Sequence, residues 1–246
     1  MPGLTALPPV VLVHGGQHGG WCWRRVADRL RAAGADVFTP TITGVGERAH
    51  LLSADITLET AVQDVAAVLE TEELADVLLV GHSFGGVPVT GVADRMPERI
   101  RRLVYLDAAV CRDGQSIMDT MPDEIRVPWL ELSQRESGGV SLPIFFEPAA
   151  ALGVTDPEAQ AWLNRRLTPH PARTYTDKSR LRNPVGNGLP ATYVVCDQPV
   201  FEGLSGSRDL AREMGWDIDT FPSGHDAMLA KPELLADRLL ALAQAG

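Results

Sequence analysis

The chain has 246 residues, of which 45% are hydrophobic, and a formal net charge of −10 at pH 7. This length suits one large α/β domain around a single core. The negative charge disfavours nucleic acid and anionic membrane surfaces as partners. The three cysteines, Cys22, Cys111 and Cys196, are too scattered for a disulfide framework or a paired zinc site, so we interpret them as reduced core thiols.

The N-terminal segment offers no targeting signal. No basic residue precedes the first apolar run, Val10–Val13, and that run is too short for a signal or membrane-spanning segment. We therefore expect a cytoplasmic protein that does not bind membranes.

In chain order, apolar runs of strand length alternate with segments of helical periodicity. This alternation is typical of βαβ units and predicts an α/β fold with a mostly parallel sheet. The six predicted strands are Val10–Val13, Asp36–Phe38, Val77–Val80, Leu103–Leu106, Ala191–Val195 and Asp217–Phe221. Helices are expected over Trp21–Ala33, Thr57–Leu69 and Pro232–Ala243, because the apolar residues of the second recur at 3.6-residue spacing and glycine or proline marks an end of the others.

The regular alternation stops between Cys111 and about Pro190, where prolines separate short helical patches. A loop-rich stretch of this length is typical of a lid or binding element. We therefore predict a core formed by residues 1–111 and 189–246 and a cap, inserted after the strand that ends at Asp107, formed by residues 112–188. Four aromatic residues would give this cap an apolar underside, or would pack it onto the core: Trp129, Phe145, Phe146 and Trp162.

The sharpest motif is a G-x-S-x-G at Gly81–Gly85, with Ser83 at its centre, directly after the apolar strand Val77–Val80. A serine at such a strand-to-helix turn takes a strained backbone conformation, and small flanking residues leave room for it. Its hydroxyl then lies at a helix N-terminus, where free N–H groups favour a developing oxyanion. The lysine of a phosphate-binding loop is absent. We therefore predict that Ser83 is a nucleophile.

An oxyanion hole needs a second donor besides the N–H of Phe84, and the loop after the first strand is the expected source. That loop, His14–Trp21, is rich in glycine, which lets the backbone approach a substrate carbonyl. We assign the second N–H to Gly16 or to its neighbour Gln17, and we expect Gly15 to contact the substrate.

The general base is expected late in the chain if the order is serine, acid, histidine. His225 lies in the loop after the last strand and fits this order. The other histidines compete weakly, because His82 belongs to the elbow and His50 and His170 lie in polar stretches. We therefore predict that His225 takes the proton of the serine.

A metal site is not indicated. His14 and His18 are four residues apart, but they lie in a loop and no acidic partner follows them. We predict neither a metal nor another cofactor.

The acid that orients the histidine has two candidates. Asp107 ends the fourth predicted strand and Asp197 follows the fifth. A charged residue at the end of an apolar parallel strand is costly unless it is solvated or paired, which makes both functional candidates. Burial arguments leave the choice open.

Several motifs resemble those of a known family. They are the V-H-G-x-x-H-G-x-W-x-W pattern at Val13–Trp23, and the segments Thr43–Arg48, Gly81–Gly86, Tyr105–Ala108, Asp113–Ser116 and Gly224–Met228. On these residues, and almost end to end, the chain resembles the α/β-hydrolase superfamily and, within it, the bacterial esterase-like relatives of the plant methylesterases and hydroxynitrile lyases.

The resemblance implies an α/β-hydrolase fold with a helical cap, a cofactor-free Ser-His-Asp triad, and oxyanion donors at Gly16 and Phe84. It also exposes a departure, because the plant members carry their acid where this chain has Pro199. The bacterial relatives carry the Tyr-Leu-Asp-Ala segment, so we favour Asp107 over Asp197 as the acid.

The resemblance also narrows the reaction. A serine at the elbow argues against dehalogenase and epoxide hydrolase chemistry, which uses an aspartate there. Hydroxynitrile lyases of this family need a lysine after the catalytic histidine and a threonine in the oxyanion loop, where this chain has Asp226 and Gly15. We therefore predict a serine esterase that cleaves a carboxylic ester, lactone or thioester of a small, largely apolar molecule, with Trp129 contacting the substrate.

Two other classes of function stay open. One is a non-hydrolytic acyl transfer, lyase or cyclisation step on the same site, and the other is a ligand-binding module with a decayed hydrolase pocket. The expected partner is the small-molecule substrate, and the chain would be a monomer or a homodimer.

Overall fold

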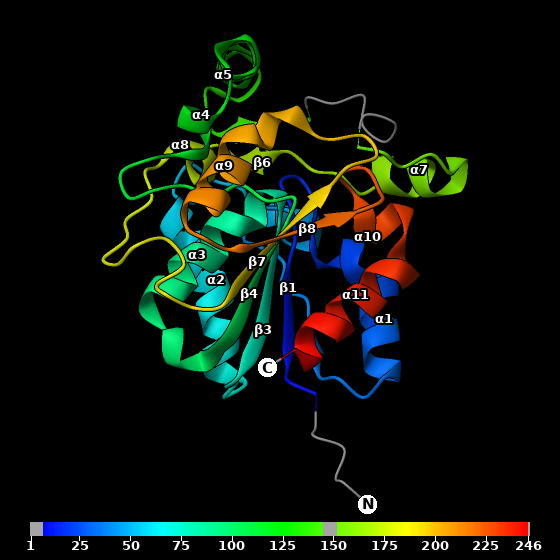
Figure 1. Cartoon of the computed structure of the whole chain (residues 1–246). Helices are drawn as coiled ribbons and strands as arrows, with labels where there is room; N and C mark the ends of the chain where they lie inside the picture. Colours follow the sequence, from blue (N-terminus) through cyan, green and yellow to red (C-terminus); the bar gives the residue numbers. More distant parts are fainter. Residues whose placement is uncertain (1–6, 145–151, 246) are drawn as a thin grey trace, which may run out of the picture.

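The computed structural model describes residues 7–144 and 152–245, which build a six-stranded sheet flanked by helices (Figure 1). The strands are β1 (Val10–Val13), β2 (Val37–Phe38), β3 (Val77–His82), β4 (Ile100–Leu106), β7 (Ala191–Cys196) and β8 (Asp217–Phe221). All are parallel, in the order β2-β1-β3-β4-β7-β8. Each predicted strand is confirmed. β4 begins at Ile100, three residues before the predicted start at Leu103, because two half-buried arginines interrupt the apolar run on which the prediction rested.

Helices cover both faces of the sheet, as Figure 1 shows. One face carries α1 (Arg24–Ala32), α10 (Ala227–Ala230) and α11 (Pro232–Gln244), and the other carries α2 (Leu58–Thr71), α3 (Gly86–Arg95) and α9 (Ser205–Glu213). The three predicted helices are confirmed, with a 3₁₀ turn at Gly20–Trp23 leading into α1. Among the helices of the described residues, none is long and apolar enough to cross a membrane.

Each central strand contributes to two hydrophobic cores, because successive side chains point to opposite faces of a sheet. On β1, Val11 and Val13 pack with α2 and α3, whereas Val10 and Leu12 pack with α1 and α11. A strand buried on both faces is a continuous apolar run in the sequence, which explains why these strands were predictable. Since the strands are parallel, their carboxyl ends meet at one edge, where loops gather to form a site.

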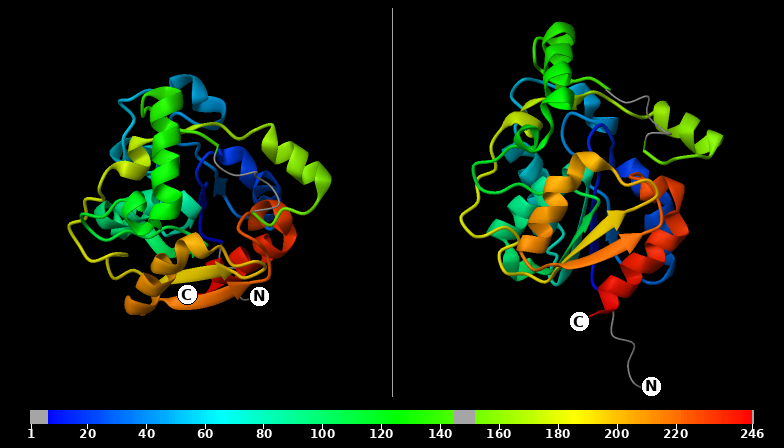
Figure 2. Two further views of the ribbon diagram at one scale, coloured as in Figure 1. Left: turned by 90° about the horizontal axis from the view of Figure 1, so that it is seen from above. Right: turned by 45° about the horizontal axis from the view of Figure 1, so that its top comes forward.

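The described parts of the chain between β4 and β7 lie over that edge (Figures 1 and 2). They contain α4 (Ile117–Thr120), α5 (Asp123–Ser137), β5 (Ser141–Leu142), α7 (Pro157–Asn164), β6 (His170–Pro171) and α8 (Arg173–Thr176). β5 and β6 form a separate antiparallel pair. Figure 2 shows α5 and α7 on opposite sides of this end of the sheet.

The four aromatic residues expected beneath this segment have different surroundings. Trp129, in α5, is 4% exposed and faces the cavity described below. Trp162, in α7, instead packs edge-on against Trp21, with 5.0 Å between ring centres. Phe145 and Phe146 lie outside the described residues. Trp162 therefore packs the segment onto the core, and Trp129 faces the site.

Candidate active site

Ser83 stands on the sharp turn between β3 and α3. Its φ of 51° lies in the left-handed region, which residues other than glycine rarely adopt. The neighbouring glycines are sterically required. A Cβ on Gly81 would lie 2.6 Å from the carbonyl oxygen of Gly85, and a Cβ on Gly85 would lie 2.7 Å from that of Val13. The turn thus has the strained serine between small residues that the motif predicted.

Three polar side chains from different strand ends form one hydrogen-bonded chain. Nδ1–H of His225 donates to Oδ2 of Asp107 at 2.6 Å, and the Ser83 hydroxyl donates to Nε2 of His225 at 2.9 Å. Asp107 is wholly buried and His225 is 5% exposed. Because the carboxylate holds the proton on Nδ1, Nε2 is the acceptor and is oriented to take a proton from the serine.

The two candidate acids occupy different environments. Asp107 directly follows β4, with a φ of 40°, and contacts His225. Asp197 follows β7, is exposed, and its carboxylate accepts no hydrogen bond from any described residue. The geometry therefore joins Asp107, and not Asp197, to the histidine.

The loop after β1 passes directly beside the elbow. A Cβ on Gly15 would lie 3.0 Å from the Cβ of Ser83. The backbone N–H of Gln17 donates to Nδ1 of His170 at 3.0 Å. Burial lowers the pKa of His170 well below its ordinary value, so the ring is neutral and Nδ1 accepts. Since the N–H of Gln17 is engaged, Gly16 is the remaining candidate for the second oxyanion donor.

His18 of the same loop forms a second histidine–aspartate pair, and both of its members line the cavity described next. Nδ1–H of His18 donates to the carbonyl oxygen of Gly16 at 2.7 Å, and Nε2–H donates to Oδ2 of Asp226 at 3.1 Å. Burial opposes a charge on either group. The charge and hydrogen bond of Asp226 nevertheless raise the pKa of His18, and those of His18 lower the pKa of Asp226. The pair therefore favours imidazolium and carboxylate, and it anchors the peptide group of Gly16.

No acidic residue follows His18 nearby in the sequence. Its partner Asp226 is far away along the chain, and the fold brings the loops after β1 and β8 together. His14 pairs with no acidic side chain of the described residues: its Nδ1–H donates to the Gly15 carbonyl, and its Nε2 accepts from the Ile42 N–H. Among the residues that the structure describes, no group of three or more potential ligands is arranged to hold a metal ion.

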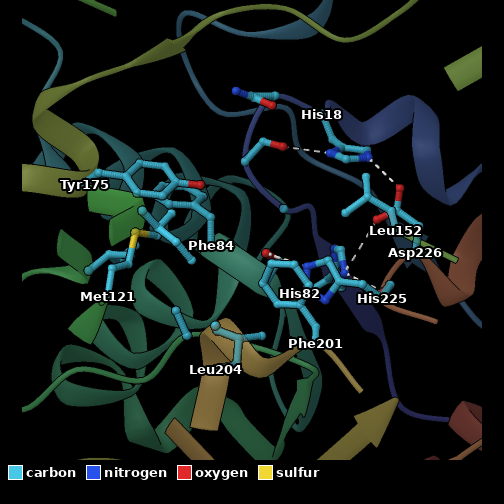
Figure 3. Close-up of a pocket in the computed structure, with 18 of the residues that line it drawn as sticks. His18, His82, Phe84, Met121, Leu152, Tyr175, Phe201, Leu204, His225 and Asp226 are labelled. Atoms are coloured by element: carbon cyan, nitrogen blue, oxygen red, sulfur yellow. Dashed lines mark hydrogen bonds and ion pairs between the residues drawn. The ribbon is translucent and has the colours of Figure 1, made fainter. Parts of the chain in front are cut away.

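A cavity of about 170 Å³ opens above the elbow (Figure 3). Its walls are mainly apolar and include Ile117, Met121, Ile125, Leu152, Phe201 and Leu204. Gly15 and Trp129, which the sequence predicted to contact the substrate, both line it. Nε1–H of Trp129 donates to the carbonyl oxygen of Pro143 at 2.9 Å, which fixes the indole. The cavity suits a compact apolar group held next to the Ser83 hydroxyl.

Sequence reasoning missed three residues of this site. His170 lies in a stretch that the sequence shows as polar, but it is wholly buried, within the β5–β6 pair. Asp226 belongs to the motif Gly224–Met228 and marks a departure from the lyases, but the sequence analysis assigns it no role; a charged residue directly after the predicted base is a signal for a buried partner. Tyr175 gave no sequence signal. It reaches the cavity from α8, a helix of four residues.

Comparison with known proteins identifies the family of the chain. The sequence model of the alpha/beta hydrolase family matches residues 10–238. The chain is 41% identical to a carbendazim hydrolyzing esterase of Nocardioides sp. (strain SG-4G), over 94% of this chain and 98% of that protein. It is 28% identical to methylesterase 1 of Arabidopsis thaliana, with 95% of each chain covered.

Among solved structures, an extracellular alpha/beta-hydrolase from a Paenibacillus species matches with a TM-score of 0.84 at 24% identity, over 97% of this chain and 100% of that one. The chain therefore belongs to the alpha/beta hydrolase family, and the predicted fold class is confirmed. Within that family it is a carboxylic ester hydrolase, related to bacterial and plant esterases.

Proposed function

We propose that the chain hydrolyses carboxylic esters, including lactones or thioesters, of small and largely apolar molecules, with Ser83, His225 and Asp107 as its catalytic triad. The observation that supports this most strongly is the hydrogen-bonded chain from the Ser83 hydroxyl through His225 to the buried Asp107, at the floor of an apolar cavity. A nucleophile, a base and an orienting acid are the three groups that acyl transfer to a serine requires.

The reaction proceeds in two acyl-transfer steps. Oγ of Ser83 attacks the ester carbonyl while Nε2 of His225 takes its proton, and the tetrahedral intermediate collapses when His225 returns that proton to the leaving alcohol. Water then attacks the acyl-enzyme, again giving a proton to His225, which passes it to Ser83 as the free acid leaves. Asp107 keeps its charge throughout and stabilises the imidazolium.

The oxyanion of both tetrahedral intermediates is bound by the backbone N–H groups of Gly16 and Phe84. Both residues line the cavity next to Ser83. Contacts hold both peptide groups around Gly16. The Gly15 carbonyl, in the peptide group that carries the Gly16 N–H, accepts from His14. In the next peptide group the Gly16 carbonyl accepts from His18 and the Gln17 N–H donates to His170. Donors that are held in place before the reaction need no reorganisation in the transition state.

Residues 112–188 act as a cap that selects the substrate. Ile117, Met121, Ile125 and Trp129 come from this segment and form much of the apolar wall above Ser83. Because the remaining wall is also mainly apolar, the cap favours acyl or alcohol groups without charge. Carbendazim, a methyl carbamate, is a rational test substrate since a relative with 41% identity is named for its hydrolysis.

The test is a panel of p-nitrophenyl esters of short to medium acyl chains, simple methyl esters and carbendazim. Ester turnover is expected for the wild type, with a loss on the order of 10⁵ to 10⁶ in kcat for Ser83→Ala. Ser205→Ala, at an exposed serine, is the matched control and keeps full activity. An intact Ser83 that turns over no ester would refute the proposal. Diversion of product to an added alcohol or amine would favour acyl transfer, and tight ligand binding without turnover would favour a binding module.

The expected cytoplasmic location and the expected monomeric or homodimeric state stay predictions. Cell fractionation tests the first, and light scattering during gel filtration tests the second.

A further inference from the structure

Tyr175 presents its hydroxyl to the cavity. The residue lies in α8, is 6% exposed, and lines the cavity above Ser83. Its hydroxyl forms no hydrogen bond with any residue that the structure describes. Figure 3 shows the ring lying next to Phe84 with the oxygen directed into the cavity.

The other two tyrosines of the chain have satisfied hydroxyl groups. Tyr105 shares a hydrogen bond of 2.9 Å with Thr90, and Tyr193 donates to the carbonyl oxygen of Ala108 at 2.8 Å. The phenol of Tyr175 instead faces the cavity and has no hydrogen-bond partner among the described residues, so it is available to donate to a ligand atom.

Neighbouring rings hold the phenol in place. Phe84 stacks on Tyr175 with 5.2 Å between ring centres and an interplanar angle of 18°. His170 and Trp129 contact it edge-on at 5.2 and 5.4 Å. These contacts restrict the ring on several sides, so its oxygen has little freedom to move and binding a ligand costs little entropy.

Tyr175 contacts both residues that we propose as oxyanion donors. Its hydroxyl oxygen rests directly on Gly16, since a Cβ at that position would lie only 2.0 Å from it, and the ring that carries it stacks on Phe84. Burial raises the pKa of Tyr175, so the phenol keeps its proton at any working pH and acts as a donor.

We propose that Tyr175 is a catalytic residue whose phenol O–H donates a third hydrogen bond to the substrate carbonyl oxygen as that oxygen becomes the oxyanion. This inference rests on the proposed function of Ser83, His225 and Asp107. No proton is transferred from the phenol. Its O–H adds to the N–H groups of Gly16 and Phe84, and because the negative charge on the oxygen grows during the attack, the bond is stronger in the transition state than in the ground state.

The test compares Tyr175→Phe with Tyr105→Phe. Both variants remove one tyrosine hydroxyl and keep the ring, but Tyr105 does not line the cavity. For Tyr175→Phe, kcat is expected to fall on the order of 10²-fold with KM changed less than about twofold. The loss should be similar for esters that differ in both acyl and alcohol groups, because the carbonyl oxygen is the part they share. Tyr105→Phe should keep the wild-type kcat.

A second readout is independent of turnover. A trifluoromethyl ketone that adds to Ser83 forms a tetrahedral oxyanion, so its inhibition constant should rise in Tyr175→Phe by about the same factor as kcat falls. An unchanged kcat, or a loss confined to esters with one particular substituent, would overturn the assignment while leaving the esterase proposal intact. If the wild type neither hydrolyses esters nor binds the ketone, the proposed function itself fails, and the role of Tyr175 fails with it.

Discussion

Replacing Asp107 by asparagine tests the triad through the position of a single proton. The carboxylate accepts a hydrogen bond from Nδ1–H of His225 at 2.6 Å. Asp107 is wholly buried, so water from the solvent cannot take over as the acceptor when the carboxylate is lost. An asparagine amide there can donate its N–H to Nδ1, which shifts the imidazole proton to Nε2. Nε2 then cannot accept the proton of Ser83, because it already carries one.

The magnitude follows from this change of tautomer. In a serine protease, the same substitution of the triad acid lowers kcat about 10⁴-fold. We expect a similar factor, which corresponds to ~5 kcal/mol of lost transition-state stabilisation. Affinity for a substrate in its ground state depends mainly on the cavity walls, so KM should change little.

The assay measures steady-state hydrolysis of the best p-nitrophenyl ester by the wild type, Asp107→Asn and Asp197→Asn. Asp197→Asn is the matched control, since it makes the same chemical change at the exposed end of the neighbouring strand β7 and should alter kcat less than about twofold. Circular dichroism shows whether each variant is folded. A folded Asp107→Asn with near wild-type kcat, or a collapse of kcat in Asp197→Asn, would refute the assignment of the acid.

Three further predictions concern residues that support the triad and the oxyanion loop. Gly85→Ala places a Cβ 2.7 Å from a backbone oxygen of β1 and should lower stability by about 1–3 kcal/mol with loss of activity, whereas Gly206→Ala, with open space around it, should be neutral in thermal melts. Asp226→Asn removes the charged partner of His18 and should lower the free energy of unfolding by about 1.5–3 kcal/mol. Because the pKa of Asp226 is lowered and that of His18 is raised from 6.5, the loss should be largest between about pH 4 and pH 6.5 and should shrink as the pH rises through the folded-state pKa of His18, or falls through that of Asp226. A pH-independent difference in melting temperature would contradict that pairing. His170→Phe keeps an aromatic ring but removes the acceptor of the Gln17 N–H, so kcat should fall about tenfold with KM nearly unchanged. An unaltered kcat would show that His170 does not position the oxyanion loop.

The sheet and the elbow were predictable because their signals are local. β1 and β3 are continuous apolar runs buried on both faces, and the serine turn needs Gly81 and Gly85 for steric reasons that hold in any fold with this turn. The loop that follows β8 was equally clear, because His225 lies between the last strand and the last helices.

The contacts that complete the site depend on distant parts of the chain, which is why the sequence left them open. Asp107 and Asp197 are both acidic residues after parallel strands, and the choice between them depends on which loop reaches His225. The pairing of His18 with Asp226 joins the loops after the first and last strands. Such contacts are set by tertiary packing, which neither composition nor periodicity reports.

Tyr175 is the site residue that was hardest to predict from the sequence. It sits in a helix of four residues within the segment where regular alternation fails, and a single tyrosine there carries no motif. Its place beside Gly16 depends on stacking against Phe84, a residue 91 positions earlier in the chain.

The most direct test of the central claim, that Ser83 is the nucleophile, is covalent labelling with a fluorophosphonate followed by mass spectrometry of peptides. We predict one added phosphonyl group per chain on the peptide that contains Ser83, its absence in Ser83→Ala, and loss of esterase activity in proportion to labelling. Label on another residue, or full inactivation with Ser83 unmodified, would contradict the account.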